Sequence, residues 1–240
     1  MKYAIIAAGK GSRLAKEGIQ TPKPLLMLQG ERLIDRLLRI FQNNGATEIL
    51  VICNEEMTEV AQHLADLQKN GLGGKPLPLR YKVKSTESSM HSLYALSPWL
   101  ADEPFILTTV DTIFNEEMFA AYAQAFEQQT DTDAFMGVTT YIDDEKPLYV
   151  GMTEAGRITG FYDDNSHDCN HISAGIYGLT PAALTTLAHC IERGEKRMRN
   201  FQRSLIAEGQ NVRGFVFTKV FDIDHASDAQ KADVFLSENK

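Results

Sequence analysis

The chain has 240 residues, which is enough for one large domain or two small ones with a core that needs no disulfide or metal. Its hydrophobic content of 43% and charged content of 23% are those of an ordinary globular protein. The 24 basic and 32 acidic residues give a formal charge of −8, which argues against non-specific nucleic-acid binding because that requires a basic surface. A nucleotide substrate is compatible with this charge, since a basic loop or a bound metal can neutralise phosphates locally.

The cysteine count and the hydropathy pattern indicate a cytoplasmic protein. Cys53, Cys169 and Cys190 are odd in number and far apart, so they predict neither a disulfide framework nor a paired zinc site. The apolar start of the chain is too short for a signal peptide, and Lys10 and Arg13 follow it at once. No stretch approaches the roughly 20 apolar residues of a membrane span, so no membrane partner is expected.

In the first half of the chain, strands and helices are predicted to alternate. The first strand, 3–7, ends at a glycine-rich turn, as a buried parallel strand does. Apolar residues then recur at helical spacing in several segments, and 43–45 is a helix stop signal. The further predicted strands are 49–53, 79–83 and 105–110, and the predicted helices are 33–41, 60–67, 88–100 and 118–126. This order predicts a largely parallel sheet that is covered on both faces.

After residue 133 the predicted order changes to strands with little helix between them. These strands are 135–141, 149–152, 158–162 and 172–179, with Ala155-Gly156 as a turn signal. Helices are predicted near Pro181 and Phe201 and after Ala226, and a strand at 212–217. No repeat, low-complexity tract or linker divides the chain, so we predict one α/β domain over residues 1–240.

The segment Ala7-Ala8-Gly9-Lys10-Gly11-Ser12-Arg13-Leu14, directly after the first strand, is the most informative. Its glycines let the backbone turn sharply and leave amide N–H groups open to an approaching phosphate. A dinucleotide-binding turn would have a third glycine where Leu14 stands, and a P-loop would close with Gly-Lys-Ser or Gly-Lys-Thr. An ordinary strand-to-helix turn also uses glycine, so this turn alone does not decide the function.

A second segment of the same long loop, Thr21-Pro22-Lys23-Pro24-Leu25, favours phosphate binding. Lys10, Arg13 and Lys23 concentrate positive charge in a short part of an acidic protein. Prolines on both sides restrict the backbone at Lys23, which suits a charge that must be held in place. The alternative is a solvated loop lysine, which the neighbouring glycine turn disfavours.

The pattern Ala-Ala-Gly-x-Gly-Ser-Arg followed by Pro-Lys-Pro-Leu resembles the signature of the nucleotidyltransferase family, the sugar-1-phosphate and phosphocholine nucleotidyltransferases and their relatives. The resemblance implies the nucleotide-diphospho-sugar transferase fold, a Rossmann-like three-layer α/β/α architecture with a mixed, mostly parallel sheet. It implies a nucleotide-binding half, 1–130, and an acceptor-side half with a closing metal motif, 131–240. The loop residues that it implies to bind the nucleotide are Ala7, Ala8, Gly9, Gly11, Ser12, Arg13 and Lys23. Of these, Arg13 and Lys23 are implied to be catalytic, with Lys23 on the α-phosphate.

Asp111 is the first candidate for the Mg²⁺ that the resemblance implies. Transfer of a nucleotidyl group brings phosphates together, so cations must relieve their repulsion, and the family uses Mg²⁺ held by carboxylates. Asp111 follows the apolar strand 105–110, and such sites lie at the carboxyl ends of strands in open α/β sheets. We therefore predict that Asp111 is a catalytic residue and a metal ligand.

A second acidic motif, Asp222-Ile223-Asp224, follows the strand 212–217. In an extended segment Asp222 and Asp224 face the same side, with Ile223 turned to the core. Together with Asp228 they resemble the closing motif of the family, so Asp222 and Asp224 are the further predicted metal ligands. The alternative is that these acidic residues cap the last helix. We assign Asp228 to capping and Asp224 to the metal, and leave both roles open for Asp222.

Residues 86–93 stand where the family has its nucleobase loop, and Glu87, Ser88 and Ser89 are the predicted contacts. The Gly-Thr-Ala pattern of many sugar-directed members is absent. The serine-rich version is closer to phosphocholine cytidylyltransferase-like members, which favours CTP or UTP. A plain helix N-cap at Ser88 or Ser89 explains the same residues almost as well.

The segment 172–177, Ile-Ser-Ala-Gly-Ile-Tyr, is similar to the Asn-Ala-Gly-Ile-Tyr strand that lies beside the acceptor in the family. Ser173, Gly175 and Tyr177 are therefore the predicted acceptor contacts, although a serine replaces the asparagine of a standard sugar contact. Asp163-Asp164 stands where the family has Glu-Lys-Pro. The Glu-Lys-Pro of this chain, 145–147, comes earlier in the strand order, so its role is not transferred.

His167, Cys169 and His171 alternate and could share one face of an extended chain. A zinc site would need a fourth ligand and a second half of the motif. We interpret the segment as a polar loop near the acceptor.

We predict an enzyme that uses Mg²⁺ to move an NMP group from an NTP to a small phosphomonoester, such as a sugar 1-phosphate or phosphocholine, with release of pyrophosphate. Its partners are the NTP and the acceptor, not nucleic acid, and no oligomeric state is predicted. One alternative is a glycosyltransferase of similar fold using an NDP-sugar, which would have no use for the glycine and lysine loop. The other is a catalytically silent nucleotide sensor, which would be expected to lack the lysine or an aspartate, and all are present.

Overall fold

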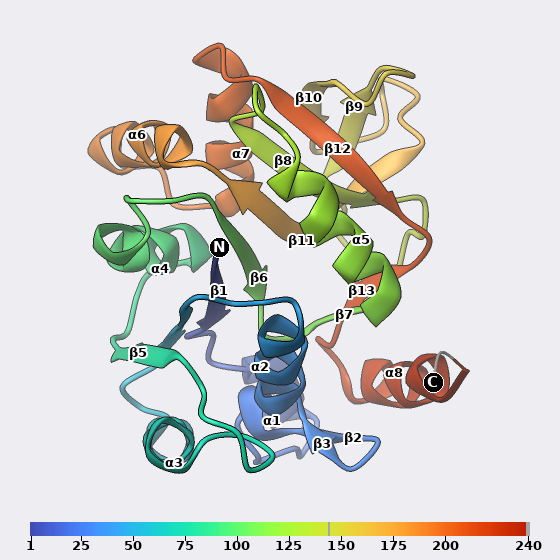
Figure 1. Cartoon of the computed structure of the whole chain (residues 1–240). Coiled ribbons are helices and arrows are strands. Elements are labelled where there is room, and N and C mark those ends of the chain that lie inside the picture. The colour runs from blue at the N-terminus through green and yellow to red at the C-terminus, as the bar shows by residue number, and fades with distance from the viewer. Residues whose placement is uncertain (144, 239–240) are drawn as a thin grey trace.

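The computed structural model describes residues 1–143 and 145–238, and a nine-stranded sheet runs through it (Figure 1). The main path across the sheet is β5 (Leu79–Val83), β4 (Ile49–Cys53), β1 (Lys2–Ala7), β6 (Phe105–Thr109), β11 (His171–Leu179), β8 (Ala134–Thr139) and β12 (Val212–Phe217). The first residues of β11 also pair with β9 (Tyr149–Met152), and β10 (Ile158–Tyr162) pairs with β9. Only β10 and β11 run against the other strands of this sheet.

Helices cover both faces of the sheet and give it two hydrophobic cores. Because side chains alternate along a strand, β1 sends Tyr3 and Ile5 to one core and Ala4 and Ile6 to the other. The first core is covered by α2 (Leu33–Asn43), α3 (Thr58–Asn70), α5 (Glu116–Glu127) and α8 (Ala226–Glu238). The second core is covered by α4 (Ser89–Leu96), α6 (Pro181–Glu192) and α7 (Met198–Ala207). The three-layer α/β/α fold with a mostly parallel sheet is therefore confirmed.

The predicted helices and strands are found, with differences at their ends. The helix predicted over 88–100 ends at Leu96 and continues as a 3-10 turn, Ser97–Trp99, because Pro98 cannot donate a helical hydrogen bond. The strand predicted over 135–141 runs instead over Ala134–Thr139. Among the helices of residues 1–143 and 145–238, none has the length and hydrophobicity that crossing a membrane requires.

Two small sheets were not predicted, because runs of two or three residues carry no detectable periodicity. β2 (Met27–Leu28) and β3 (Glu31–Arg32) form a hairpin after the 3-10 turn Lys23–Leu25. β7 (Thr112–Phe114) pairs with β13 (Val220–Asp222), which comes much later in the chain. This second pairing aligns Thr112 with Asp222 and so brings the two predicted acidic motifs together.

Gly178 in β11 is a position where any side chain would disturb the packing. A Cβ added there would lie 2.9 Å from Cγ of Phe126 and 3.0 Å from two further ring carbons. We expect Gly178→Ala to lower the free energy of unfolding by about 1–3 kcal/mol in urea denaturation. Gly9→Ala is the matched control, since nothing lies within 4 Å of a Cβ at that position, and it should leave stability unchanged or slightly raised. Equal stability of the two variants would contradict the prediction.

Candidate active site

The glycine turn after β1 packs against the segment that carries Lys23. The chain turns at Gly11 into the short helix α1 (Ser12–Lys16). Gly11 has a φ of 59°, in the left-handed region that favours glycine, and a Cβ there would lie 3.6 Å from Cβ of Lys23. The two segments that were predicted to bind phosphate therefore lie together.

A cleft of about 370 Å³ opens beside this turn. The predicted nucleotide-binding residues that line it are Ala8, Gly9, Gly11, Lys23, Glu87, Ser88 and Ser89. Ala7 is instead buried within β1, and Ser12 is exposed at the start of α1. Arg13 lines a neighbouring cleft, with Asp222 and Asp224.

Asn54 lines the same cleft and was missed by the sequence reasoning. It follows β4, is 2% exposed, and donates from Nδ2 to the carbonyl of Ala8 at 3.1 Å. Its Oδ1 accepts a hydrogen bond from Oγ of Ser85 at 3.0 Å. Asn54 thereby ties the glycine turn to the loop that precedes α4. Its place at the carboxyl end of a parallel strand is the signal that could have found it.

Ser88 caps α4, as one of the two interpretations of this loop expected. Its Oγ accepts from the backbone N–H of His91 at 3.5 Å and lies 3.0 Å from Nδ1 of the same residue. Ser88 and Ser89 also line the nucleotide-side cleft. The capping role of Ser88 is confirmed, and its contact with a nucleobase stays a prediction.

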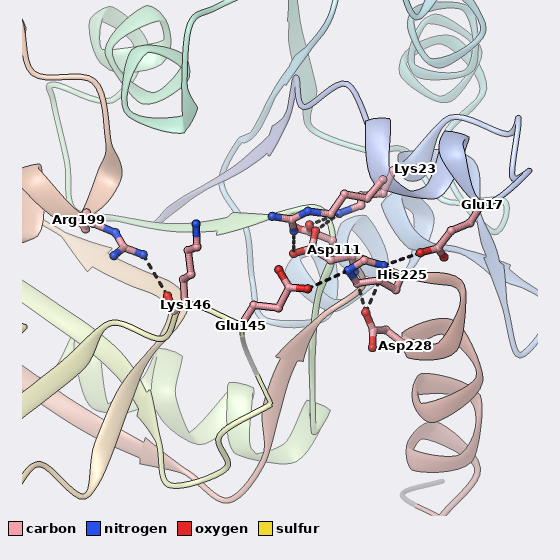
Figure 2. Close-up of polar contacts among 10 residues, drawn as sticks. Glu17, Lys23, Asp111, Glu145, Lys146, Arg199, His225 and Asp228 are labelled. Carbon is pink, nitrogen blue, oxygen red and sulfur yellow. Dashed lines mark hydrogen bonds and ion pairs between the residues drawn. The ribbon is translucent and has the colours of Figure 1, made fainter. Parts of the chain in front are cut away.

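Lys23 lies at the centre of a charged cluster drawn from distant parts of the chain (Figure 2). Its Nζ is 2.5 Å from Oδ2 of Asp111 and 3.1 Å from Oδ1 of Asp224, and its side chain is only 11% exposed. Arg13 binds the other oxygen of Asp224, with NH1 2.5 Å from Oδ2. Burial acts to lower the pKa of Lys23, but the two carboxylates outweigh burial and raise that pKa, so Lys23 stays protonated.

A second set of contacts joins α1 to the start of α8 (Figure 2). The Glu17 carboxylate accepts from the backbone N–H of Ala226 at 2.7 Å and lies 2.5 Å from Nδ1 of His225. These two contacts hold the pKa of Glu17 below its usual value. Nε2 of His225 lies 3.6 Å from Oε1 of Glu145. The contacts connect the helix of Arg13 to the segment of Asp224, which supports the pairing of those two side chains.

Asp222 and Asp224 lie on either side of Ile223, which is fully buried, as predicted. Asp222 is open to the cleft. The surrounding protein nevertheless disfavours the charged form of its carboxyl group, and the negative charge of Asp111 repels that form. Together these two effects raise the pKa of Asp222 to about 8. The predicted capping role of Asp228 is confirmed. Its Oδ2 accepts from the backbone N–H groups of His225 at 2.8 Å and Asp224 at 3.1 Å, at the N-terminus of α8.

The raised pKa of Asp222 predicts how the stability of the metal-free protein depends on pH. A carboxyl group whose pKa is higher in the folded than in the unfolded chain favours the folded state when protonated, so stability is lost as pH rises from about 4 to about 8. We expect Asp222→Asn to flatten this decline when denaturation is measured in EDTA between pH 5 and 8. The effect should stay well below the ceiling of about 1.4 kcal/mol per pH unit, because water reaches the side chain. Parallel pH profiles of the two proteins would contradict it.

The carboxylates of this cluster have the oxygen ligands that Mg²⁺ prefers. Within the described residues, however, no group of three or more Asp, Glu, His or Cys side chains is arranged to hold a metal ion. Lys23 instead binds both Asp111 and Asp224. Since Mg²⁺ commonly uses one or two carboxylates together with substrate phosphates, this donor set fits an ion that arrives with a triphosphate.

The predicted acceptor residues meet the charged cluster at a bulge in β11. Gly175 has a φ of 71° where the pairing of β11 with β8 shifts register, and a Cβ there would lie 3.3 Å from Oγ1 of Thr112 and 4.0 Å from Oδ1 of Asp222. Ser173 accepts at Oγ from Nε2 of Gln202 at 2.8 Å. Tyr177 is only 7% exposed, and burial raises the pKa of its hydroxyl. Ser173, Gly175 and Tyr177 all line an open cleft that also contains Asp222.

Two further segments that the sequence analysis discussed are the Glu-Lys-Pro, 145–147, and the segment of His167 and Cys169, of which only the first lines the acceptor-side cleft. Lys146, from the Glu-Lys-Pro whose role was not transferred, lines the cleft, and Glu145 lines the neighbouring one. His167 stacks on Tyr162 with ring centroids 3.8 Å apart, and Cys169 is buried. The lining residues Lys196, Arg197 and Arg199 were missed, because nothing in their local sequence connects them to the acidic motifs.

Comparison with known proteins identifies the family of this chain. Residues 3–151 match the family model described as the MobA-like NTP transferase domain. The chain is 24% identical over 245 residues to the UTP–glucose-1-phosphate uridylyltransferase AglF of Haloferax volcanii, covering 99% of this chain and 97% of that protein. It is 23% identical over 203 residues to the probable glucose-1-phosphate cytidylyltransferase of Bacillus subtilis, covering 78% of each.

A solved structure, the inositol-1-phosphate CTP transferase from T. maritima, superposes with a TM-score of 0.81 at 19% identity, covering 100% of this chain and 96% of that one. It supports the nucleotide-diphospho-sugar transferase fold. The family model spans more than half of this chain and includes the glycine turn, Lys23 and Asp111. The chain therefore belongs to the MobA-like NTP transferase domain family.

Proposed function

We propose that this protein transfers an NMP group from an NTP to a small phosphomonoester and releases pyrophosphate, with CTP or UTP as the favoured nucleotide. The observation that carries the proposal is the contact of Lys23 with both Asp111 and Asp224, at the edge of a cleft formed by the glycine turn. A protonated, mostly buried lysine beside open backbone amides suits the binding of a triphosphate.

The chain's own residues would act by binding and by charge. Gly9 and Gly11 leave room at the cleft for phosphate oxygens, while Lys23 and Arg13 stabilise negative charge on them. The acceptor phosphate is already a nucleophile as a dianion, so no general base is needed and catalysis rests on positioning. Mg²⁺ held by Asp111 and Asp224, with Asp222 beside them, would supply further charge neutralisation between the phosphates.

The proposal extends to the acceptor side and to the chain as a whole. Ser173, Gly175 and Tyr177 line a cleft that contains Asp222, which supports their role as acceptor contacts. We propose that residues 1–240 act as one domain, because Asp224 of the second half binds Lys23 and Arg13 of the first. The unpaired thiols of Cys53, Cys169 and Cys190 support a cytoplasmic location.

The experiment that tests this proposal measures pyrophosphate release with Mg²⁺, each of the four NTPs, and a panel of acceptors. The panel contains sugar 1-phosphates, inositol 1-phosphate, phosphocholine and other small phosphomonoesters. We expect release that depends on the acceptor and is fastest with CTP or UTP. Release with none of the combinations would overturn the proposed activity and leave the family assignment.

A further inference from the structure

Four basic side chains line the acceptor-side cleft, which has a volume of about 320 Å³, in a protein whose net charge is −8. We call this cleft the basic pocket and define it by Lys146, Lys196, Arg197 and Arg199. Asp222 is the one acidic residue that lines it within residues 1–143 and 145–238. Positive charges that lie close together in a concave site repel each other and destabilise the folded protein unless an anion compensates for them.

The basic pocket adjoins both parts of the proposed reaction site. It shares Ser88 and Ser89 with the nucleotide-side cleft and Asp222 with the cleft of the charged cluster. In the view of Figure 2, Lys146 lies between Arg199 and the Lys23–Asp111 pair. A small molecule bound there would therefore lie beside a nucleotide and extend away from Lys23.

The present partners of Lys196 and Arg197 leave these two side chains able to bind an anion. Lys196 pairs with Glu87 at 3.2 Å, but both side chains are more than 60% exposed, and such surface pairs contribute little. Arg197 has no ion pair in the part of the chain that the structure describes. Arg199 binds Asp163 through NH1, while its NH2 donates to the carbonyl of Lys146 at 3.1 Å.

The N-terminus of α7 adds to the positive potential of the same pocket. Arg197 is the N-cap residue, no side chain caps the helix, and its first turn contains no acidic residue. The first N–H groups of the helix thus reinforce the charges of Arg197 and Arg199 instead of opposing them. Gln202, one turn further along, lines the pocket and is fixed by its hydrogen bond to Ser173.

We propose that the acceptor carries a second anionic group, a carboxylate or a phosphate, and that the basic pocket binds this group. The inference rests on the proposed transferase function, because it assumes that the reacting phosphate lies near Lys23 and Asp222. Glu87, Asp163 and Asp222 offset part of the charge of the four basic residues, but Lys196 and Arg197, on the α7 side of the cleft, stay able to pair with an anion besides the reacting phosphate. A cationic acceptor such as phosphocholine is disfavoured by the same charges.

The test compares acceptors that differ in one anionic group. The pair 3-phosphoglycerate with glycerol 3-phosphate tests a carboxylate, and the pair glucose 1,6-bisphosphate with glucose 1-phosphate tests a second phosphate. Binding to the whole protein is measured by calorimetry with Mg²⁺ and a non-hydrolysable CTP analogue, so the readout does not require turnover. In at least one pair we expect the member with the additional anionic group to bind roughly 10- to 100-fold more tightly, as for charge-assisted contacts.

The double variant Lys196→Ala/Arg197→Ala should reduce this binding ratio to near 1. The matched control Lys69→Ala/Lys75→Ala, which removes the same number of exposed positive charges at the end of α3 and the loop after it, should keep the ratio. The inference is overturned if neither pair shows a preference, if the double variant keeps it, or if phosphocholine binds more tightly than glycerol 3-phosphate. If pyrophosphate is released only with acceptors whose one anionic group is the reacting phosphate, the proposed function stands and the inference is overturned. If no acceptor gives pyrophosphate release, although the binding ratio still depends on Lys196 and Arg197, the proposed function is overturned instead.

Discussion

Lys23→Ala is expected to lower kcat for NMP transfer by about 10²- to 10³-fold, the cost of losing one preorganised charge at a developing phosphoryl charge. Lys23 is the only residue that binds both Asp111 and Asp224 within the described chain, and its pKa is raised by them, so it is charged at any working pH. The effect should fall on kcat more than on the KM for the NTP, because the charge matters most in the transition state. Steady-state assays of pyrophosphate release give both parameters.

Two further variants make this prediction specific to Lys23. Lys23→Arg keeps the positive charge but changes its shape and reach, so it should recover part of the lost rate. Lys16→Ala removes an exposed lysine of α1 outside the clefts and should behave as wild type. A Lys23→Ala protein that is folded by circular dichroism and keeps near-full turnover would show that Lys23 has no catalytic role.

Asp111→Asn should lower kcat by a similar factor of about 10²–10³, for a different reason. The substitution keeps the size of the side chain but removes its charge, so both the partner of Lys23 and a proposed metal ligand are lost. We therefore expect the Mg²⁺ concentration needed for half-maximal rate to rise as well, which a magnesium titration of pyrophosphate release measures.

Asp131→Asn serves as the control for Asp111→Asn. Asp131 is exposed in the connection between α5 and β8, so neutralising it changes the net charge equally without touching the cluster. Its magnesium curve should match that of the wild type. If Asp111→Asn changed neither kcat nor the magnesium requirement, the proposed role of this carboxylate would be wrong.

Most of the fold could be predicted because its strands are buried on both faces. Segments such as Ile49–Cys53 form continuous apolar runs, and the residues of α2 recur at helical spacing, so local sequence identifies them. The pairing of β7 with β13 could not be predicted in this way. Each strand has three residues and the two are far apart in the chain, so only the packed structure aligns Thr112 with Asp222.

The site residues that could be predicted are those whose neighbours in the sequence indicate their backbone conformation or position. The turn at Gly11 and the prolines beside Lys23 are visible in sequence, as is the position of Asp111 after an apolar strand. The contact of Lys23 with Asp224, and the meeting of Lys146 with Arg197 and Arg199, join separate segments and follow from tertiary packing alone. The sequence therefore indicates the triphosphate side better than the acceptor side.

The central claim is that the chain transfers an intact NMP group, and labelled nucleotides test it most directly. With Mg²⁺, CTP or UTP and an active phosphomonoester, label from [α-³²P]NTP should appear in the organic product, and label from [γ-³²P]NTP should appear in pyrophosphate. Both labelled products should form about 10²- to 10³-fold more slowly with Lys23→Ala. Label from the γ-position in the acceptor or in free phosphate would contradict the account, as would transfer of sugar from an NDP-sugar, or tight NTP binding without any release of pyrophosphate.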